Sequence, residues 1–407
     1  MKTLIKKYTE TPLIARIAIG LVIGILCGLL FPQAGFLAVF GNVFVGALKA
    51  VAPILVFVLV ISSIAGAGEG VGKCFKTVTI LYMASTFLAA VVAVVASYLF
   101  PVTIPLSEAV EQSAPEKLGD VFTTLLNNMV ANPVTSIMNA NYVGILTWAV
   151  VFGLALRKLA SQATKSILND LSAAVSKAVA WVIQLAPFGI MGLVYSSVSE
   201  YGINIFKDYG KLLLLLVGCM LVVALIIDPL LASICLKRNA YPLVFRCLKE
   251  SGITAFFTRS SAANIPVNMA LCEKLGLDRE YYSVSIPLGA TINMDGAAIT
   301  ITIMSLAAAF SQGIQVNIFL AIILSFVATL GACGASGVAG GSLLLIPMAC
   351  SLLGVPQDIA MQVVGVGFII GVVQDSLETA INSSGDVLFT ATAEFRKWMK
   401  EGKEVKF

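Results

Sequence analysis

The sequence predicts an all-α polytopic membrane protein, on the basis of its composition, its hydropathy and the length of its apolar segments. Of the 407 residues, 58% are hydrophobic and only 12% are charged, whereas a soluble domain carries about 25% charged residues. The mean hydropathy of +0.96 is too high for one soluble core. Several apolar stretches reach the length of about 20 residues at which a helix spans the hydrocarbon core. We therefore expect one membrane domain whose side chains face lipid or other buried helices.

The first 240 residues are predicted to form ordinary transmembrane helices. The first apolar run follows a basic N-terminal segment but has no convincing signal-peptide cleavage site, so we expect it to be retained as a helix. Within it, Gly20, Gly24 and Gly28 recur every four residues, a spacing that lets a neighbouring helix approach closely. The candidate spans are residues 14–31, 37–65, 78–100, 138–157, 175–198 and 211–236.

Basic residues in the loops predict the orientation of these spans. Lys and Arg are concentrated before the first span, between the second and third, after the fourth and after the sixth. These segments share one side if each span crosses once, and the positive-inside rule places that side in the cytoplasm. The loop 101–137 is acidic and is expected to be solvated on the opposite side. We therefore expect cytoplasmic termini and a location in the bacterial inner membrane.

Several kinds of site are excluded or disfavoured by the residue types present. The chain has no histidine, which removes His-based triads and His proton relays. Its eight cysteines show no C-x-x-C spacing, so we expect neither a disulfide framework nor a zinc site. The glycine-rich run 68–74 looks like a phosphate loop but has Cys74 where Ser or Thr would bind magnesium. Neither an ATPase nor a nucleic-acid partner is expected.

The region from about 240 to 390 departs from the simple pattern, because small and polar clusters interrupt its apolar segments. Non-helical backbone at membrane depth is tolerated only where it is buried in protein or lines a cavity. The order of a turn, a helix and a broken helix occurs twice here, which is typical of internally repeated transporters. The clusters lie at residues 258–261, 293–296, 331–341 and 382–386, and we expect the final helix to be interrupted at the last of them.

Polar and ionisable residues follow one face of the final predicted helix. They are spaced at 0, 3, 4, 7 and 11 residues, so they share a helix face. The apolar residues around them embed this face in the bundle, where ionisable groups are functional candidates because insertion costs about 2.5–3.5 kcal/mol each. Alternatively, these groups only pair with one another or with Arg259. The residues are Asp375, Glu378, Thr379, Asn382 and Asp386.

The same cluster suits a zwitterion and a sodium ion together. Carboxylates and carbonyl-type side chains are the oxygen ligands that a hard cation takes. Unwound backbone carbonyls at the breaks would add more, while N–H groups at half-helix ends would take an anionic carboxylate. The sequence therefore favours a site that binds an amino acid and its coupling ion side by side.

These motifs resemble those of the dicarboxylate/amino-acid:cation symporter family, which includes the glutamate transporters and their archaeal aspartate relatives. The segments 258–261 and 331–341 are similar to the tips of the family's two re-entrant hairpins, 293–296 to its broken seventh helix, and 375–386 to its eighth. The resemblance implies eight transmembrane helices plus two re-entrant hairpins. It also implies a homotrimer in which a transport domain slides past a scaffold like an elevator.

The resemblance also implies roles for individual residues. Asp375 would hold the substrate ammonium, and Asn382 its carboxylate, helped by backbone N–H groups at the hairpin tips. Sodium is implied as the coupling ion, with no other cofactor. The implied substrate-site residues are Ser260, Ser261, Ala297, Asp375, Glu378, Thr379 and Asn382. The implied sodium-site residues are Tyr82, Ser85, Thr86, Gly289, Thr291, Asn293, Asp295, Asn382 and Asp386.

Two departures from the family pattern bear on the substrate. Members that bind acidic substrates have an arginine where this chain has Glu378, and a threonine where it has Ala297. A carboxylate facing a carboxylate in a low-dielectric site is repulsive, so acidic substrates should be rejected. The remaining pattern resembles the serine/threonine:sodium symporters of the family. Glu378 is expected to accept a hydrogen bond from a substrate hydroxyl, with pairing to Arg259 as the alternative role.

Two other functions remain open at this point. One is a proton-coupled or acidic-substrate carrier of the same family, and the other is a channel or an intramembrane enzyme. An intramembrane enzyme is disfavoured because Ser260, the candidate nucleophile, has neither a histidine nor a nearby lysine to activate it. The expected organisation is residues 1–240 as mainly scaffold and trimerisation helices, with the third helix at about 78–100 joining the transport domain, 241–390 as the transport core, and 391–407 as a cytoplasmic tail.

Overall fold

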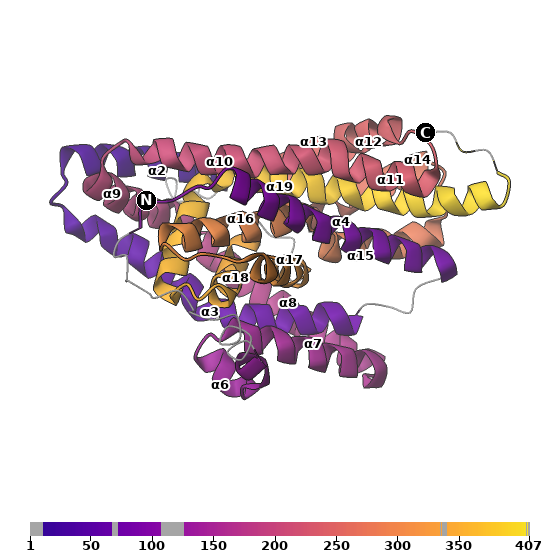
Figure 1. Ribbon diagram of the computed structural model, residues 1–407, viewed down its shortest axis with the longest axis horizontal. Helices are drawn as coiled ribbons and strands as arrows, with labels where there is room; N and C mark the ends of the chain where they lie inside the picture. Colours follow the sequence, from indigo (N-terminus) through magenta and orange to yellow (C-terminus); the bar gives the residue numbers. More distant parts are fainter. Residues whose placement is uncertain are drawn as a thin grey trace.

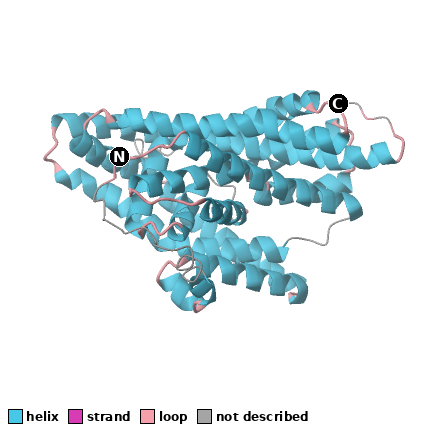
Figure 2. Cartoon of the chain, in the orientation of Figure 1, coloured by secondary structure: helices cyan, strands magenta, loops and turns pink. Residues whose placement is uncertain are grey.

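The computed structural model describes residues 11–66, 72–106, 126–333, 335, 340–403 and 405. Regular structure within these ranges is helical, and no strand occurs in them (Figure 2). Six helical segments of the described chain are long and apolar enough to cross a membrane. The prediction of an all-α polytopic membrane protein is confirmed at this level. The first helices are α2 (Leu13–Leu30), α3 (Ala38–Gly66), α4 (Gly72–Leu99), α6 (Pro133–Met138), α7 (Tyr142–Leu159), α8 (Gln162–Ile183) and α9 (Ala186–Tyr201).

The later helices carry most of the predicted site. A π-helical turn, η2 (Val223–Ile227), joins α10 (Ile205–Val222) and α11 (Asp228–Leu236) into one continuous rod. A second π turn, η3 (Leu248–Gly252), lies between the next two helices. The later helices are α10 (Ile205–Val222), α11 (Asp228–Leu236), α12 (Tyr241–Cys247), α13 (Ile253–Thr258), α14 (Ser261–Lys274), α15 (Arg279–Ile292), α16 (Asp295–Ser311), α17 (Ile318–Ala332), α18 (Ile346–Leu352) and α19 (Gln357–Lys400).

The glycines of the first helix produce the close packing that their spacing predicts. Helix α2 packs along α9. A Cβ atom on Gly20 would lie 2.2 Å from the backbone oxygen of Pro187, and one on Gly24 would lie 2.6 Å from that of Met191. No side chain fits at these distances, so the two backbones can touch only because the residues are glycine.

One predicted span proves to be two helices. The span 175–198 is wrong as a single crossing, because α8 ends at Ile183 and α9 begins at Ala186. Pro187 stands in the first turn of α9. Proline supplies no N–H, so position 187 cannot donate to the backbone oxygen of Ile183, and the hydrogen-bond pattern of the helix is interrupted there. The predicted span 138–157 likewise begins later, where Asn141 caps α7 through a 3.2 Å hydrogen bond from the N–H of Gly144.

The helices form two sets of direct neighbours. In one set α3 packs against α7, α8 and α9, while α2 lies along α9. In the other, α4 and α16 pack against each other and against α19. Figure 1 shows α10, α11 and α19 running together along the long axis, with α7 and α8 on the opposite side of the molecule.

Two of the predicted backbone breaks are present as expected. Helices α13 and α14 are joined by a tight turn in which Arg259 takes a left-handed conformation with φ 51°. Ser260 caps α14, its hydroxyl accepting from the N–H of Ala263 at 3.2 Å. The second break separates α15 from α16 at Asn293 and Met294, whose backbone is non-helical. The 331–341 turn lies partly outside the described residues, which resume at Gly340 before the short 3-10 turn η4 (Ser342–Leu345).

The predicted interruption of the final helix is wrong. Helix α19 runs for 44 residues without a break. The hydroxyl of Ser384 donates to the backbone oxygen of Ala380 at 2.8 Å, which keeps the serine compatible with a helix. Gly385 serves a close approach instead, since a Cβ there would lie 2.6 Å from Nδ2 of Asn293.

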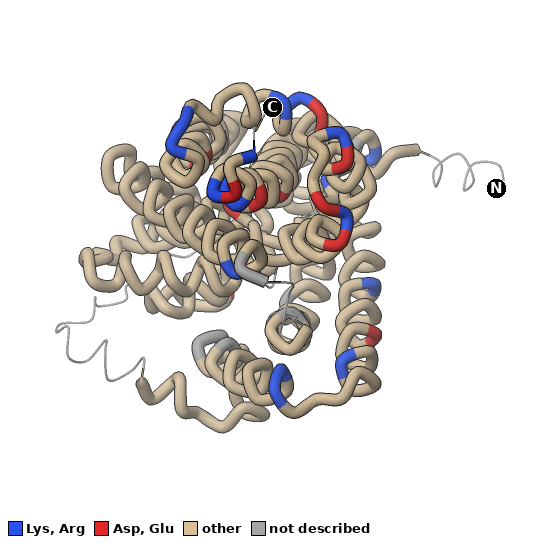
Figure 3. The backbone as a smooth tube through the Cα atoms, turned by 90° about the vertical axis from the view of Figure 1, so that its right-hand side faces the viewer, with Lys and Arg blue, Asp and Glu red and all other residues tan. Residues whose placement is uncertain are grey.

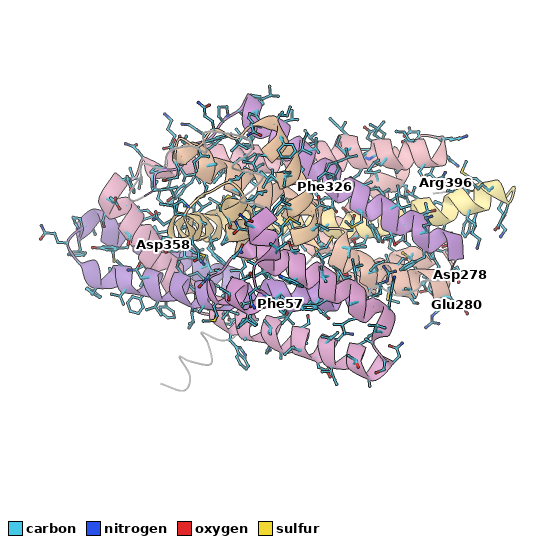
Figure 4. All side chains as sticks on the ribbon, turned by 60° about the horizontal axis from the view of Figure 1, so that its bottom comes forward. Phe57, Asp278, Glu280, Phe326, Asp358 and Arg396 are labelled. Atoms are coloured by element: carbon cyan, nitrogen blue, oxygen red, sulfur yellow. The ribbon has the colours of Figure 1, made fainter. Side chains whose placement is uncertain are left out.

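Charged residues gather at one end of the long axis. Figure 3, viewed from the right of Figure 1, shows many of the Lys, Arg, Asp and Glu residues at that end. Figure 4 places Asp278, Glu280 and Arg396 toward the same end and Asp358 toward the other. The N-terminal basic segment, residues 68–71 of the glycine-rich run and most of the acidic 101–137 loop lie outside the described residues.

Candidate functional site

The polar face of α19 is buried, as expected for a stripe that faces the bundle interior. Asp375 is 2% exposed, Glu378 6%, Asn382 3% and Asp386 0%. Each of these side chains has specific partners on other elements, and the partners divide the face into an Asp375 half, with Asp375 and Glu378, and an Asp386 half, with Asn382 and Asp386.

Asp375 connects the two turns that flank α19. Its Oδ2 lies 2.7 Å from Nε of Arg259 in the α13–α14 turn. Its Oδ1 accepts a 3.0 Å hydrogen bond from the N–H of Gly340. Both partners of the ion pair are buried, so the pair is held in a low-dielectric environment. Pairing of Arg259 with the α19 stripe is therefore real, but it involves Asp375 and not Glu378.

Glu378 is anchored by neutral donors. Its Oε2 accepts from the hydroxyl of Thr300 at 2.7 Å and from that of Ser342 at 2.9 Å. Nε2 of Gln374 donates to the same oxygen. These donors come from α16, η4 and α19, and all three hydrogen bonds end on Oε2. One carboxylate oxygen is thus fixed, while Oε1 accepts no hydrogen bond from a described residue.

Asn382 and Asn293 join α19 to the break between α15 and α16. Oδ1 of Asn382 accepts from the N–H of Gly296 at 2.8 Å, in the first turn of α16. Nδ2 of Asn293 donates to the backbone oxygen of Asn382 at 3.0 Å and to Oδ1 of Asp386 at 3.2 Å. Nδ2 of Asn382 makes only a 3.4 Å contact with the sulfur of Met294. That donor therefore has no strong acceptor in the described chain.

Helix α4 brings two hydroxyls to the carboxylate of Asp295. Ser85 Oγ lies 2.7 Å from Oδ2 and Thr86 Oγ1 lies 3.0 Å from Oδ1. All three side chains are fully buried. Ser85 Oγ also lies 2.8 Å from Oδ1 of Asp228 on α11. The sequence analysis singled out Ser85, Thr86 and Asp295 but assigned no role to Asp228.

Tyr82 lies one helical turn away and belongs to the Asp386 half. Its hydroxyl lies 3.0 Å from the backbone oxygen of Asp386 and 2.8 Å from Oγ1 of Thr390. Gly289 is the close neighbour of both, since a Cβ there would lie 2.7 Å from Oδ1 of Asp386 and 2.8 Å from the Tyr82 hydroxyl. The structure therefore separates the three α4 residues into two neighbouring groups.

The remaining predicted residues line these groups without making new polar links. Ser261 and Ala297 are buried at the starts of α14 and α16. The Thr379 hydroxyl donates to the backbone oxygen of Asp375 at 2.8 Å, within its own helix. Thr291 is exposed, and its hydroxyl donates to the backbone oxygen of Leu288 at 2.7 Å. Both threonine hydroxyls donate to the backbone of their own helix, and these hydrogen bonds do not link them to Asp295 or Asp386.

A buried amide network was missed by the sequence analysis. Nδ2 of Asn264 donates to the hydroxyls of Ser251 at 3.0 Å and Ser383 at 2.8 Å. Nδ2 of Asn268 donates to the Ser383 backbone oxygen at 3.1 Å and lies 3.5 Å from Oδ2 of Asp386. The signal was two asparagines four residues apart in an apolar helix, on one face. The network fixes the α13–α14 hairpin to α19 beside Asp386.

The Asp375 half is compact in this structure. A cavity of about 10 Å³ lies beside Arg259 and Asp375, enough for about one water molecule. A cavity of about 710 Å³ lies elsewhere, between α4 and α10, and its lining is almost wholly apolar. Ligand binding between the two turns therefore requires Arg259 or the turns to move.

The site also differs from a transition-metal centre. The described residues contain no group of three or more His, Cys, Asp or Glu side chains placed to hold a metal ion. The acidic side chains are instead surrounded by hydroxyl, amide and backbone oxygens. Such donor sets suit hard cations, which take oxygen ligands.

Comparison with known proteins identifies the family of the chain. Residues 13–395 match the model of the sodium:dicarboxylate symporter family. A protein of Bifidobacterium adolescentis named serine/threonine transporter SstT is 59% identical over 399 residues, covering 98% of this chain and 93% of that protein. Proteins of the same name from Streptococcus agalactiae and Streptococcus thermophilus are 57% and 54% identical, over 97% and 98% of this chain and 98% and 100% of their own length. The chain therefore belongs to the sodium:dicarboxylate symporter family.

Proposed function

We propose that this protein is a sodium-coupled symporter that imports serine and threonine across the bacterial inner membrane. The observation that carries the substrate class is the buried, anchored carboxylate of Glu378, at the position where the family's acidic-substrate members have an arginine. The names of the similar proteins support the same substrates.

Glu378 would select for a hydroxyl group through its second oxygen. Thr300, Ser342 and Gln374 hold Oε2 and so orient the carboxylate. Oε1 would then accept from a serine or threonine hydroxyl, a hydrogen bond to a charged group that contributes about 1.5–3 kcal/mol. A carboxylate side chain on the substrate would face like charge in a low-dielectric site and would be rejected.

The two ends of the amino acid would be bound by groups already in place. Asp375 would take the substrate ammonium, in the position that the guanidinium of Arg259 holds in this structure. The free donor of Asn382 and the backbone N–H groups around Ser260 and Ser261 would take the carboxylate. Substrate binding in this scheme exchanges one cation at Asp375 for another, so little net charge is buried when the site fills.

Sodium would bind at two buried acidic groups, one at Asp295 and one at Asp386. Asp295 with Ser85 and Thr86 forms one oxygen-rich group, and Asp386 with Asn293 forms the other. Oδ1 of Asn293 is buried and has no hydrogen-bond partner in the described chain. Buried carboxylates need a compensating charge, and an unpaired acceptor oxygen needs a donor or a cation. A sodium ion would supply both needs.

The two sets of packed helices support the division into a scaffold and a transport domain. The set around α2, α3, α7, α8 and α9 would form the scaffold of a homotrimer, and α4 with α12 to α19 would form the moving part. Helices α10 and α11, which were expected among the scaffold helices of residues 1–240, pack against α19, and we assign them to the moving part instead. The α13–α14 and α17–α18 pairs would be the two re-entrant hairpins of an eight-helix fold. In an elevator mechanism, the moving part would carry the substrate with its sodium ions across the bilayer, with both chain termini in the cytoplasm.

Uptake of labelled L-serine into proteoliposomes tests this proposal. The expected result is uptake that depends on an inward sodium gradient and is blocked by unlabelled threonine but not by aspartate or glutamate. Block by aspartate would contradict the role of Glu378. Uptake that follows a proton gradient at fixed sodium would favour the proton-coupled alternative.

A further inference from the structure

Asp228 is a buried carboxylate in the middle of the α10–α11 rod, outside the residues assigned above. It is 3% exposed, and it directly follows the π turn η2. π turns inside helices often occur at functional sites, because they rotate the following residues out of the regular helical register. Pro229 follows directly and cannot donate a backbone hydrogen bond.

The Ser85 hydroxyl lies between two carboxylates. Its Oγ is 2.8 Å from Oδ1 of Asp228 and 2.7 Å from Oδ2 of Asp295. A serine hydroxyl has a single hydrogen, so it can donate to only one of them. The other close oxygen–oxygen contact therefore has no hydrogen between its atoms if both carboxylates are ionised. A proton on one carboxyl group or a cation bound between the two would remove this repulsion.

No lysine or arginine in the part of the chain that the structure describes supplies such a charge. Among the described residues, neither Asp228 nor Asp295 forms an ion pair with a lysine or arginine, unlike Asp375 with Arg259. The α15–α16 break that carries Asp295 also carries Asn293, which the proposed function assigns to the neighbouring Asp386 group. Oδ1 of Asn293 is fully buried and unpartnered, while its Nδ2 is occupied by Asn382 and Asp386. A buried amide oxygen without a hydrogen-bond donor indicates a bound cation, which takes the lone pair of that oxygen.

We propose that Asp228 is a further charged residue of the α4 sodium site and shares one sodium ion with Asp295 across Ser85. This inference rests on the sodium coupling proposed above and adds a carboxylate from a different helix to that site. Two carboxylates attract a cation more strongly than one, so Asp228 sets the sodium affinity of the site. It also ties the α10–α11 rod to α4 and α16 when the ion is bound.

Sodium-dependent binding of labelled serine to the purified full-length protein tests the assignment. Asp228→Asn keeps the shape and removes the charge, and Asp208→Asn on the same rod, in an exposed pair with Lys211, is the matched control. The half-saturating sodium concentration should rise about tenfold or more in Asp228→Asn and stay at the wild-type value in Asp208→Asn. Thermal stabilisation by sodium, compared with potassium, should weaken in parallel.

The outcomes separate this inference from the proposed function. If serine binding by the wild type needs no sodium, the sodium coupling itself is wrong. If the wild type needs sodium but Asp228→Asn has the same half-saturating concentration, Asp228 is not part of the site. Should that variant fail to fold, Asp228→Glu moves the charge by one methylene and should change the preference between sodium and lithium. An unchanged preference would overturn the assignment.

Discussion

Arg259 and Asp375 form a 2.7 Å ion pair that joins the α13–α14 turn to the middle of α19. The two residues lie 116 positions apart in the sequence. The N–H of Gly340 donates to the other carboxylate oxygen of Asp375. Under the proposed function, the same Asp375 must bind the substrate ammonium. The guanidinium and the substrate then compete for one carboxylate, and Arg259 acts as an internal stand-in for the substrate cation.

This competition predicts opposite effects of Arg259→Gln on stability and on ligand response. Without substrate, the variant leaves Asp375 buried and unpaired, which should destabilise the protein by about 3–5 kcal/mol. With saturating serine, the ammonium replaces the lost partner, so the serine-induced rise in melting temperature should exceed that of the wild type. Differential scanning fluorimetry with and without serine measures both effects.

Arg246→Gln provides the matched control, because Arg246 pairs with Glu250 at 3.1 Å on the protein surface. Exposed pairs contribute about 0–1 kcal/mol, so this variant should change neither quantity appreciably. A serine response in Arg259→Gln equal to that of the wild type would show that the two cations do not compete for Asp375.

The anchored carboxylate of Glu378 predicts a change of selectivity in Glu378→Gln. The neutral amide loses the charged hydrogen bond to a substrate hydroxyl, and Thr300 and Ser342 then face an amide. Serine should lose affinity relative to alanine by about tenfold or more, as measured by competition with labelled serine. Glu394→Gln is the control on the same helix, since the buried carboxylate of Glu394 accepts from the N–H of Asp278 and lies outside the proposed site. An unchanged serine-to-alanine ratio would remove Glu378 from the specificity argument.

Local patterns predicted the helices and the buried face of α19, but not the meaning of each small residue. The spacing of Asp375, Glu378 and Asn382 indicated one face, and all three are buried. The glycine and serines near 385 looked like a break, yet the helix continues. A glycine that allows close contact and a glycine that ends a helix have the same local signature. Only the distant partner, Asn293, distinguishes them.

Long-range pairs lay beyond the sequence for a similar reason. Helical periodicity reports which residues share a face but not which face of another helix they meet. Arg259 could therefore be matched to Asp375 or to Glu378, and Asp228 could not be assigned to any partner. Pro187, in contrast, was a local signal for the break between α8 and α9 and was visible within the span 175–198.

The close approach at Gly385 predicts a specific defect in Gly385→Ala. The added Cβ would lie 2.6 Å from Nδ2 of Asn293 and would push that amide away from Asp386. Overpacking of this kind costs about 1–3 kcal/mol, and the half-saturating sodium concentration for serine binding should rise. Gly210→Ala on α10 has no atom within 4 Å of the new Cβ and should be neutral or stabilising. Equal behaviour of the two variants would contradict the proposed role of Asn293 beside Asp386.

The buried amide network predicts that Asn268 supports the sodium site from outside it. Asn268→Ala removes donors to the Ser383 backbone oxygen and to Asp386, and it leaves the hydroxyl of Ser251 without its 2.5 Å acceptor. Each buried group left unpaired costs about 1–3 kcal/mol, so the melting temperature should fall. Sodium affinity should fall with it, because α19 is then less firmly held where Asp386 lies. Asn204→Ala is the control, since Asn204 is exposed and its side chain makes no capping bond to α10. A loss of stability without any change in the sodium dependence of serine binding would restrict Asn268 to a purely structural role.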